Sequence, residues 1–170
     1  MAKLGVVNWM LRLRIVGLLA LAGSMVLMVI NHFTASNGAE VTYKFVDSYN
    51  YVLATAVIGA AYILVQLPFA IYYACIEKGM TRNEYLLEFE FYGDKLISLI
   101  LATGVGAGFA ASIEQQRHIK HDNDTRKWKN FLDLGIVSTA LLALGFVCMI
   151  IVSMLSSINR NSSMRGGVYG

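Results

Sequence analysis

Few groups of residues in this sequence have types and spacings that could support chemistry. One such group is His118-x-x-His121, which lies close to Glu114, Asp122 and Asp124. Imidazole and carboxylate groups can hold a zinc ion when they form a closed ligand set, and no closed set is visible here. We therefore predict a solvated polar loop in this region, with no metal and no other cofactor.

The glycine-rich segment 104–108, Gly-Val-Gly-Ala-Gly, has the composition of a nucleotide-binding loop. Such a loop must follow a strand and open a helix, so that its backbone amides reach a phosphate. These glycines lie instead inside an uncharged run, with no strand before them. The sequence also contains no nucleophile elbow, zinc-protease motif, Walker loop or kinase motif set. We predict a protein that is not an enzyme and that has no nucleic acid among its partners.

Two charged residues stand out because each one opens a long uncharged run. Arg14 precedes residues 15–30, and Asp94 stands just before the run 96–113. A charge within a membrane span normally faces protein or water and finds a partner there. Because a guanidinium can bind a carboxylate through two hydrogen bonds, Arg14 and Asp94 are candidates for an intramembrane ion pair. Alternatively, Arg14 extends to the lipid headgroups, while Asp94 caps the third helix or pairs with Lys95.

The uncharged runs themselves predict helices that cross a membrane. They are the apolar run 15–30, after which polar residues follow, and the uncharged runs 48–76, 96–113 and 134–159, in a chain with 56% hydrophobic and only 15% charged residues. Soluble domains carry about 25% charged residues, and a helix needs about 20 residues to cross a membrane. The first and third runs are slightly short, so their spans must include the flanks that carry the two charges. Continuous apolar runs favour helices over barrel strands.

We therefore predict an all-α membrane protein, with a single four-helix bundle over residues 1–170. The expected spans are about 13–33, 49–76, 93–113 and 133–157. We expect the first span to be retained, because no small-residue cleavage signal follows it. Four spans place both termini on one side of the membrane. More Lys and Arg residues precede the first span than follow it, so we expect both termini in the cytosol.

Small residues at helical spacing predict how these helices pack. The face of the third helix that carries Asp94 also carries Gly104-x-x-x-Gly108, and Thr55-x-x-x-Gly59 repeats the spacing in the second helix. Small residues let helices approach closely, so this face should point at protein and take Asp94 with it. Packing within one chain explains these motifs, although some of them could instead mediate dimers.

Three further positions predict local features. Pro68 removes a backbone hydrogen bond in the second span, so we expect a kink where Gln66 could satisfy a freed carbonyl. Cys75 falls at the inner end of that span and is either a packing residue or a palmitoylation site. Asn123 begins a glycosylation sequon in a loop expected outside, whereas a second sequon at Asn161 lies in a tail expected inside.

Three of the four spans carry segments that resemble a known family. The matching segments are Leu11-Arg12-Leu13-Arg14 with the run ending at 28–31, Tyr49-Asn50-Tyr51 with 60–68, and Phe91-Tyr92-Gly93-Asp94 with 99–111. Over residues 10–156 the chain resembles the plant Casparian strip membrane domain protein-like (CASP-like) family, which is itself similar to the MARVEL four-span proteins of animals and fungi. The fourth span matches only in type.

The resemblance implies that Arg14 and Asp94 are the family's paired intramembrane charges, with Arg12 as the competing choice for the arginine. It also implies a plasma-membrane protein that contacts membrane lipid, forms homodimers and heterodimers with other CASP-like proteins, and organises a membrane domain. The family's founding members recruit secreted enzymes that modify the cell wall. This chain lacks the loop cysteines and the extended first-loop motif of those founders, so it resembles the broader CASP-like set. The alternative function is a pore or transporter subunit.

Overall fold

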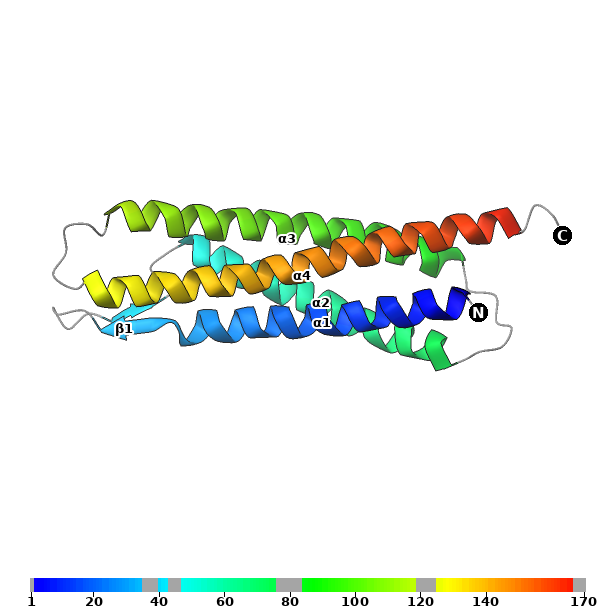
Figure 1. Ribbon diagram of the computed structural model, residues 1–170, viewed down its shortest axis with the longest axis horizontal. Helices are drawn as coiled ribbons and strands as arrows, with labels where there is room; N and C mark the ends of the chain where they lie inside the picture. The colour runs from blue at the N-terminus through cyan, green and yellow to red at the C-terminus, as the bar shows by residue number, and fades with distance from the viewer. Residues whose placement is uncertain (1, 35–39, 43–46, 76–83, 119–124, 167–170) are drawn as a thin grey trace.

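The computed structural model describes residues 2–34, 40–42, 47–75, 84–118 and 125–166 of the chain (Figure 1). These ranges contain the helices α1 (Ala2–Ile30), α2 (Asp47–Cys75), α3 (Glu84–His118) and α4 (Thr125–Gly166). The predicted helical bundle is confirmed. The strands β1 (His32–Thr34) and β2 (Glu40–Thr42) form a short antiparallel pair that the sequence patterns did not predict.

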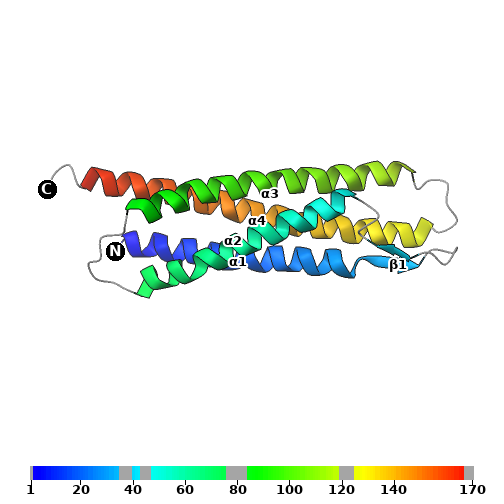
Figure 2. The same cartoon turned by 180° about the vertical axis from the view of Figure 1, so that it is seen from behind.

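The four helices form an up-down-up-down bundle in which consecutive helices run in opposite directions (Figures 1 and 2). Helix α1 packs against α2 and α4, and helix α3 packs against the same two neighbours. Helices α1 and α3 are therefore diagonal partners that point the same way. The start of α1 and the end of α4 lie at the same end of the bundle (Figure 1).

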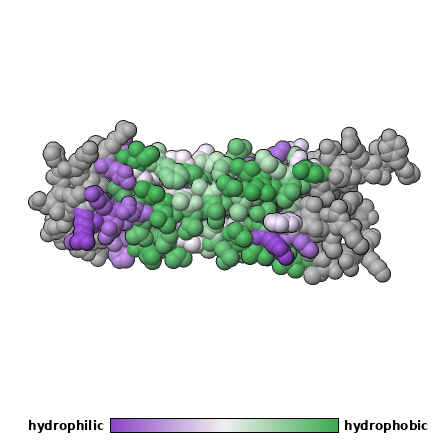
Figure 3. Space-filling model, in the orientation of Figure 1, coloured by the Kyte–Doolittle hydropathy of each residue, from purple (hydrophilic) through white to green (hydrophobic). Residues whose placement is uncertain are grey.

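Each helix contains a segment that is long and apolar enough to cross a membrane: Asn8–Ile30, Asp47–Ile71, Phe91–Gln116 and Arg126–Ile158. Large apolar side chains also point away from the bundle, with Leu19 and Leu99 each 67% exposed. A hydrophobic band covers the middle of the molecule, and hydrophilic patches lie toward its ends (Figure 3). A surface of this kind would aggregate in water but is stable against lipid tails. The chain is therefore a multi-pass membrane protein.

The first helix ends earlier than the expected boundary at residue 33. Helix α1 stops at Ile30, and β1 begins at His32. Asn31 lies between them and is 2% exposed; its backbone N–H donates to the Met28 carbonyl, and its side-chain Nδ2 donates to the Phe131 carbonyl 2.9 Å away. These two bonds satisfy the Met28 carbonyl and the Asn31 side-chain amide where the chain leaves the helix.

The centre of the bundle is filled by apolar side chains from all four helices, such as Leu21, Ile63, Leu101 and Leu142, each of which is fully buried. Neutral polar contacts join helices in the half of the bundle that lies away from the termini. The Ser138 hydroxyl of α4 donates to the Ser24 carbonyl of α1 at 2.8 Å. The hydroxyls of Tyr49 in α2 and Ser112 in α3 lie 3.0 Å apart. Such bonds matter in lipid, where water cannot replace them.

The small residues of α3 let it approach both neighbours closely. A Cβ atom at Gly104 would lie 2.9 Å from the Thr55 Cβ in α2, and one at Gly108 would lie 2.7 Å from the Thr139 Cγ2 in α4. Gly59 in α2 is buried in the same way, because a Cβ atom there would lie 2.9 Å from Leu101. The structure therefore uses these residues, Gly104, Gly108, Thr55 and Gly59, for packing within one chain.

Candidate functional site

The structure brings Arg14 and Asp94 together across the diagonal of the bundle. Arg14 comes from α1 and Asp94 from α3, and the distance between Arg14 Nη2 and Asp94 Oδ2 is 3.5 Å. The two side chains are 3% and 0% exposed, so they form an ion pair inside the protein. Because α1 and α3 are not direct neighbours, the length of the arginine side chain is needed to reach the carboxylate.

Helix α2 lies between α1 and α3 around the bundle and adds two polar side chains to the pair. The Tyr62 hydroxyl donates a hydrogen bond of 2.9 Å to Asp94 Oδ1, the carboxylate oxygen that does not face Arg14 Nη2. The Gln66 amide Nε2 donates in turn to the Tyr62 hydroxyl. Tyr62 and Gln66 are four residues apart and therefore lie on one face of the helix. We call Arg14, Tyr62, Gln66 and Asp94 the polar cluster.

Gln66 and Lys95 have partners that differ from those expected from the sequence. The Gln66 amide donates to Tyr62, and not to a carbonyl freed by Pro68. Helix α2 continues through Pro68, and the kink there stays a prediction. The Lys95 ammonium lies 3.9 Å from the centroid of the Phe91 ring, so this lysine stacks on an aromatic side chain.

The positions of Arg12 and Asp94 do not fit two of the alternatives. Arg12 is not the arginine that pairs with Asp94, and Asp94 does not cap helix α3. Arg12 is exposed, whereas Arg14 is buried against Asp94, so Arg14 is the arginine that enters the bundle. Helix α3 begins at Glu84, well before Asp94, so the aspartate lies in the helix interior and does not cap the helix.

Gly93 provides the space that the Tyr62 ring needs. A Cβ atom at position 93 would lie 2.9 Å from Tyr62 Cε2 and would also meet the hydroxyl that binds Asp94. The sequence does contain a signal for this arrangement. Gly93 stands beside Asp94 in one span, and Tyr62 and Gln66 lie four residues apart in another. From the sequence, however, Tyr62 and Gly93 were recognised only as parts of the segments that resemble the family, without a role in the site.

The chemistry of the polar cluster suits a static contact between helices. A guanidinium does not lose its proton in proteins, so Arg14 cannot act as a base. Each oxygen of the Asp94 carboxylate faces a partner, Arg14 on one side and Tyr62 on the other. In the described part of the chain, no group of three His, Cys, Asp or Glu residues could hold a metal ion. The cluster therefore joins α1, α2 and α3 by opposite charge and hydrogen bonding.

The two candidate modification sites lie apart from the polar cluster. Asn123 lies outside the described residues. Cys75 is the last residue of α2, and its side chain is also outside the described part. Glycosylation of Asn123 and palmitoylation of Cys75 stay predictions.

Removing the Tyr62 hydroxyl is expected to weaken the polar cluster. In Tyr62→Phe, Asp94 Oδ1 and the Gln66 amide both lose a partner in the membrane interior, so we expect the free energy of unfolding to fall by about 1–3 kcal/mol. The matched control is Tyr51→Phe in the same helix, whose exposed hydroxyl contacts Thr103. Thr103 keeps its bond to the Ile100 carbonyl in that variant, so the loss should be smaller.

Unfolding by heat or by denaturing detergent, followed through helical circular dichroism in mild micelles, would compare the two tyrosine variants. Equal stability of Tyr62→Phe and Tyr51→Phe would contradict a supporting role for the Tyr62 hydroxyl.

The chain matches the family model described as Casparian strip membrane protein domain over residues 4–148. It is 37% identical over 148 residues to CASP-like protein 4D1 of Ricinus communis, covering 85% of this chain and 86% of that protein. It is 35% identical to CASP-like protein 4D1 of Populus trichocarpa, covering 85% and 82% of the two chains. It is 32% identical to CASP-like protein 4D2 of Arabidopsis thaliana, covering 87% of each chain.

No solved structure is detectably similar to this chain. The matched region of the family model contains nearly all of α1, the whole of α2 and α3 and most of the membrane span of α4, and it includes every residue of the polar cluster. The resemblance found in the sequence is therefore confirmed, and this chain belongs to the CASP-like family of Casparian strip membrane domain proteins.

Proposed function

We propose that this protein is a non-enzymatic plasma-membrane scaffold that associates with itself and with other CASP-like proteins and organises a local membrane domain. Both termini face the cytosol in this proposal. The domain would provide a site where secreted enzymes modify the cell wall.

The observation that carries the proposal is the burial of the ion pair between α1 and α3. Arg14 and Asp94 are 3% and 0% exposed, and fully buried Leu21, Leu101 and Leu142 fill the centre of the bundle. A substrate site or an ion path needs polar groups that solvent can reach. A sealed polar cluster instead supports a rigid body whose outer surface makes the functional contacts.

The outer surface of the spans fits association within the membrane. Intrachain packing already occupies Gly104 and Gly108, so self-association would use side chains that point outward. Helix α3 presents the exposed residues Leu99, Thr103 and Gly106 to its surroundings. Lipid tails are as apolar as these side chains, so contacts between bundles depend on close van der Waals packing and not on the hydrophobic effect.

Mobility in the membrane tests the scaffold role directly. We expect a fluorescent fusion of the full chain to recover slowly after photobleaching in the plasma membrane, because molecules in an assembled domain exchange slowly. We also expect two differently tagged copies to purify together in mild detergent. A well-folded chain that recovers rapidly and purifies only as a monomer would refute the proposal.

The second candidate, a pore or transporter subunit, derives from the presence of charged groups within the spans. It predicts ion or solute flux in vesicles containing the purified chain, and a change in that flux in Asp94→Asn. The burial of the polar cluster favours the scaffold. Flux that depends on Asp94 would reverse this preference.

A further inference from the structure

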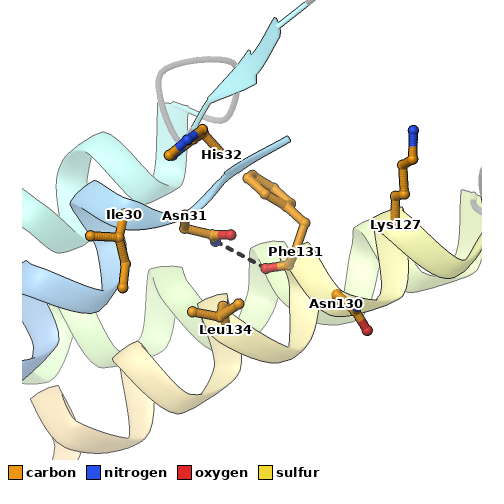
Figure 4. Close-up of a pocket in the computed structure, with 7 residues that line it drawn as sticks. All are labelled: Ile30, Asn31, His32, Lys127, Asn130, Phe131 and Leu134. Carbon is orange, nitrogen blue, oxygen red and sulfur yellow. Dashed lines mark hydrogen bonds between the residues drawn. The ribbon is translucent and has the colours of Figure 1, made fainter. Parts of the chain in front are cut away.

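A pocket of about 210 Å³ opens at the end of the bundle that lies away from the chain termini (Figure 4). It lies where α1 ends and α4 begins, next to β1. Its polar lining comes from Asn31, His32, Lys127 and Asn130, and its apolar lining includes Ile30 and Leu134. The proposed scaffold role does not involve this pocket.

The pocket lies at the level where a membrane changes from hydrocarbon to headgroups. Ile30 is the last residue of the first span, and the fourth span begins at Arg126, just before Lys127. Leu134 lies two helical turns farther into that span, on the hydrocarbon side. The lining therefore changes from apolar to polar in the same direction as a phospholipid changes from acyl chain to headgroup.

The inner wall of the pocket is held by buried contacts. Asn31 donates to the Phe131 carbonyl at 2.9 Å, and both residues are 2% exposed. The Phe131 ring packs against Tyr49 and Trp128, with centroid distances of 5.9 and 6.0 Å. Figure 4 shows the Phe131 side chain between His32 and Lys127. A pocket with such a wall is already formed before a ligand arrives, so binding does not have to order it.

We propose that this pocket binds an anionic glycerophospholipid. The lipid phosphate faces the Lys127 ammonium, and the start of one acyl chain lies along Ile30 and Leu134. Lysine is a strong phosphate binder, so the Lys127 ammonium suits the phosphate of such a headgroup. The exposed Asn130 amide and His32 imidazole also line the pocket and offer hydrogen bonds to the glycerol and phosphate oxygens.

Trp128 provides a built-in reporter for this site. The chain has two tryptophans, and Trp9→Phe leaves only Trp128, which contacts the pocket wall through Phe131. The full chain with this change is reconstituted into phosphatidylcholine vesicles that contain brominated phosphatidylglycerol or, in a parallel sample, brominated phosphatidylcholine. We expect stronger quenching of Trp128 by the anionic lipid at equal content.

Two variants test the assigned role of the lysine. Lys127→Ala should weaken phosphatidylglycerol binding about tenfold, because a charge-assisted contact is lost. Lys129→Ala removes an exposed lysine on the same helix but outside the pocket lining. Its effect on phosphatidylglycerol binding should be several-fold smaller than that of Lys127→Ala. Asn130→Asp adds a repelling charge at an exposed position and should remove the preference for the anionic lipid.

The inference is overturned if both lipids quench Trp128 equally, or if the Lys127 and Lys129 variants lose the same affinity. Inorganic phosphate in the buffer distinguishes the two sources of the ligand chemistry. If it restores the fluorescence, the pocket is a site for free phosphate and the lipid assignment is wrong. Retained helical circular dichroism shows that each variant is folded.

Discussion

Asp94→Ala is expected to destabilise the bundle by about 3–5 kcal/mol, because it leaves the Arg14 charge without its carboxylate inside the protein. The same change removes the acceptor of the Tyr62 hydrogen bond. Unfolding of the purified chain in mild micelles by a denaturing detergent would measure the difference. The matched control is Lys95→Ala, which removes an adjacent, exposed charge and should cost about 1 kcal/mol or less.

Exchanging the two charges separates their interaction from their individual roles. The double variant Arg14→Asp with Asp94→Arg should recover part of the stability that each single change loses. Recovery should be incomplete, because the Tyr62 hydroxyl donates to a carboxylate on α3 in the native protein. If the losses of the two single variants simply add in the double variant, Arg14 and Asp94 do not stabilise each other.

Gly108→Ala is expected to destabilise the bundle by about 1–3 kcal/mol through overpacking. The added Cβ would lie 2.7 Å from Thr139 Cγ2 and 2.9 Å from Val52 Cγ2. Both neighbours are β-branched and therefore stiff, so they cannot turn away and the helices must separate. Thermal unfolding in micelles would measure the loss.

The control for this prediction is Gly106→Ala, two residues away on the same helix. In the described part of the chain, a Cβ atom at Gly106 would meet no neighbouring heavy atom within 4 Å. Because alanine stabilises a helix relative to glycine by about 0.5–1 kcal/mol, this variant should be as stable as the native protein or more so. If both glycine variants behave alike, close approach at Gly108 does not determine stability.

The sequence was sufficient to predict the helices, because an uncharged run of membrane length has few structures open to it in lipid. It also made Arg14 and Asp94 candidates for a pair, because both charges fall at the start of spans that run the same way. Tyr62 and Gly93 were harder to recognise. Their roles depend on which face of α2 turns toward α3, and the hydrophobic pattern of a lipid-exposed helix does not specify that face.

The short strands after α1 were missed for a different physical reason. Three-residue strands are too short to show an alternating pattern. The sequence between them contains Asn37-Gly38, a dipeptide typical of hairpin turns, but without longer flanking strands this signal alone does not predict a hairpin. The pocket beside β1 could not be predicted either. It combines residues of α4 with the end of α1, which are about a hundred positions apart in the sequence.

The diagonal position of the ion pair has a consequence for how the protein is made. Ribosomes synthesise α1 first, so Arg14 enters the bilayer before the third helix that carries Asp94 exists. During that interval the arginine must reach water or headgroups, and a nascent chain that stops before α3 keeps an uncompensated charge in its first helix. Arrival of the third helix therefore neutralises the charge that the first helix brings into the bilayer.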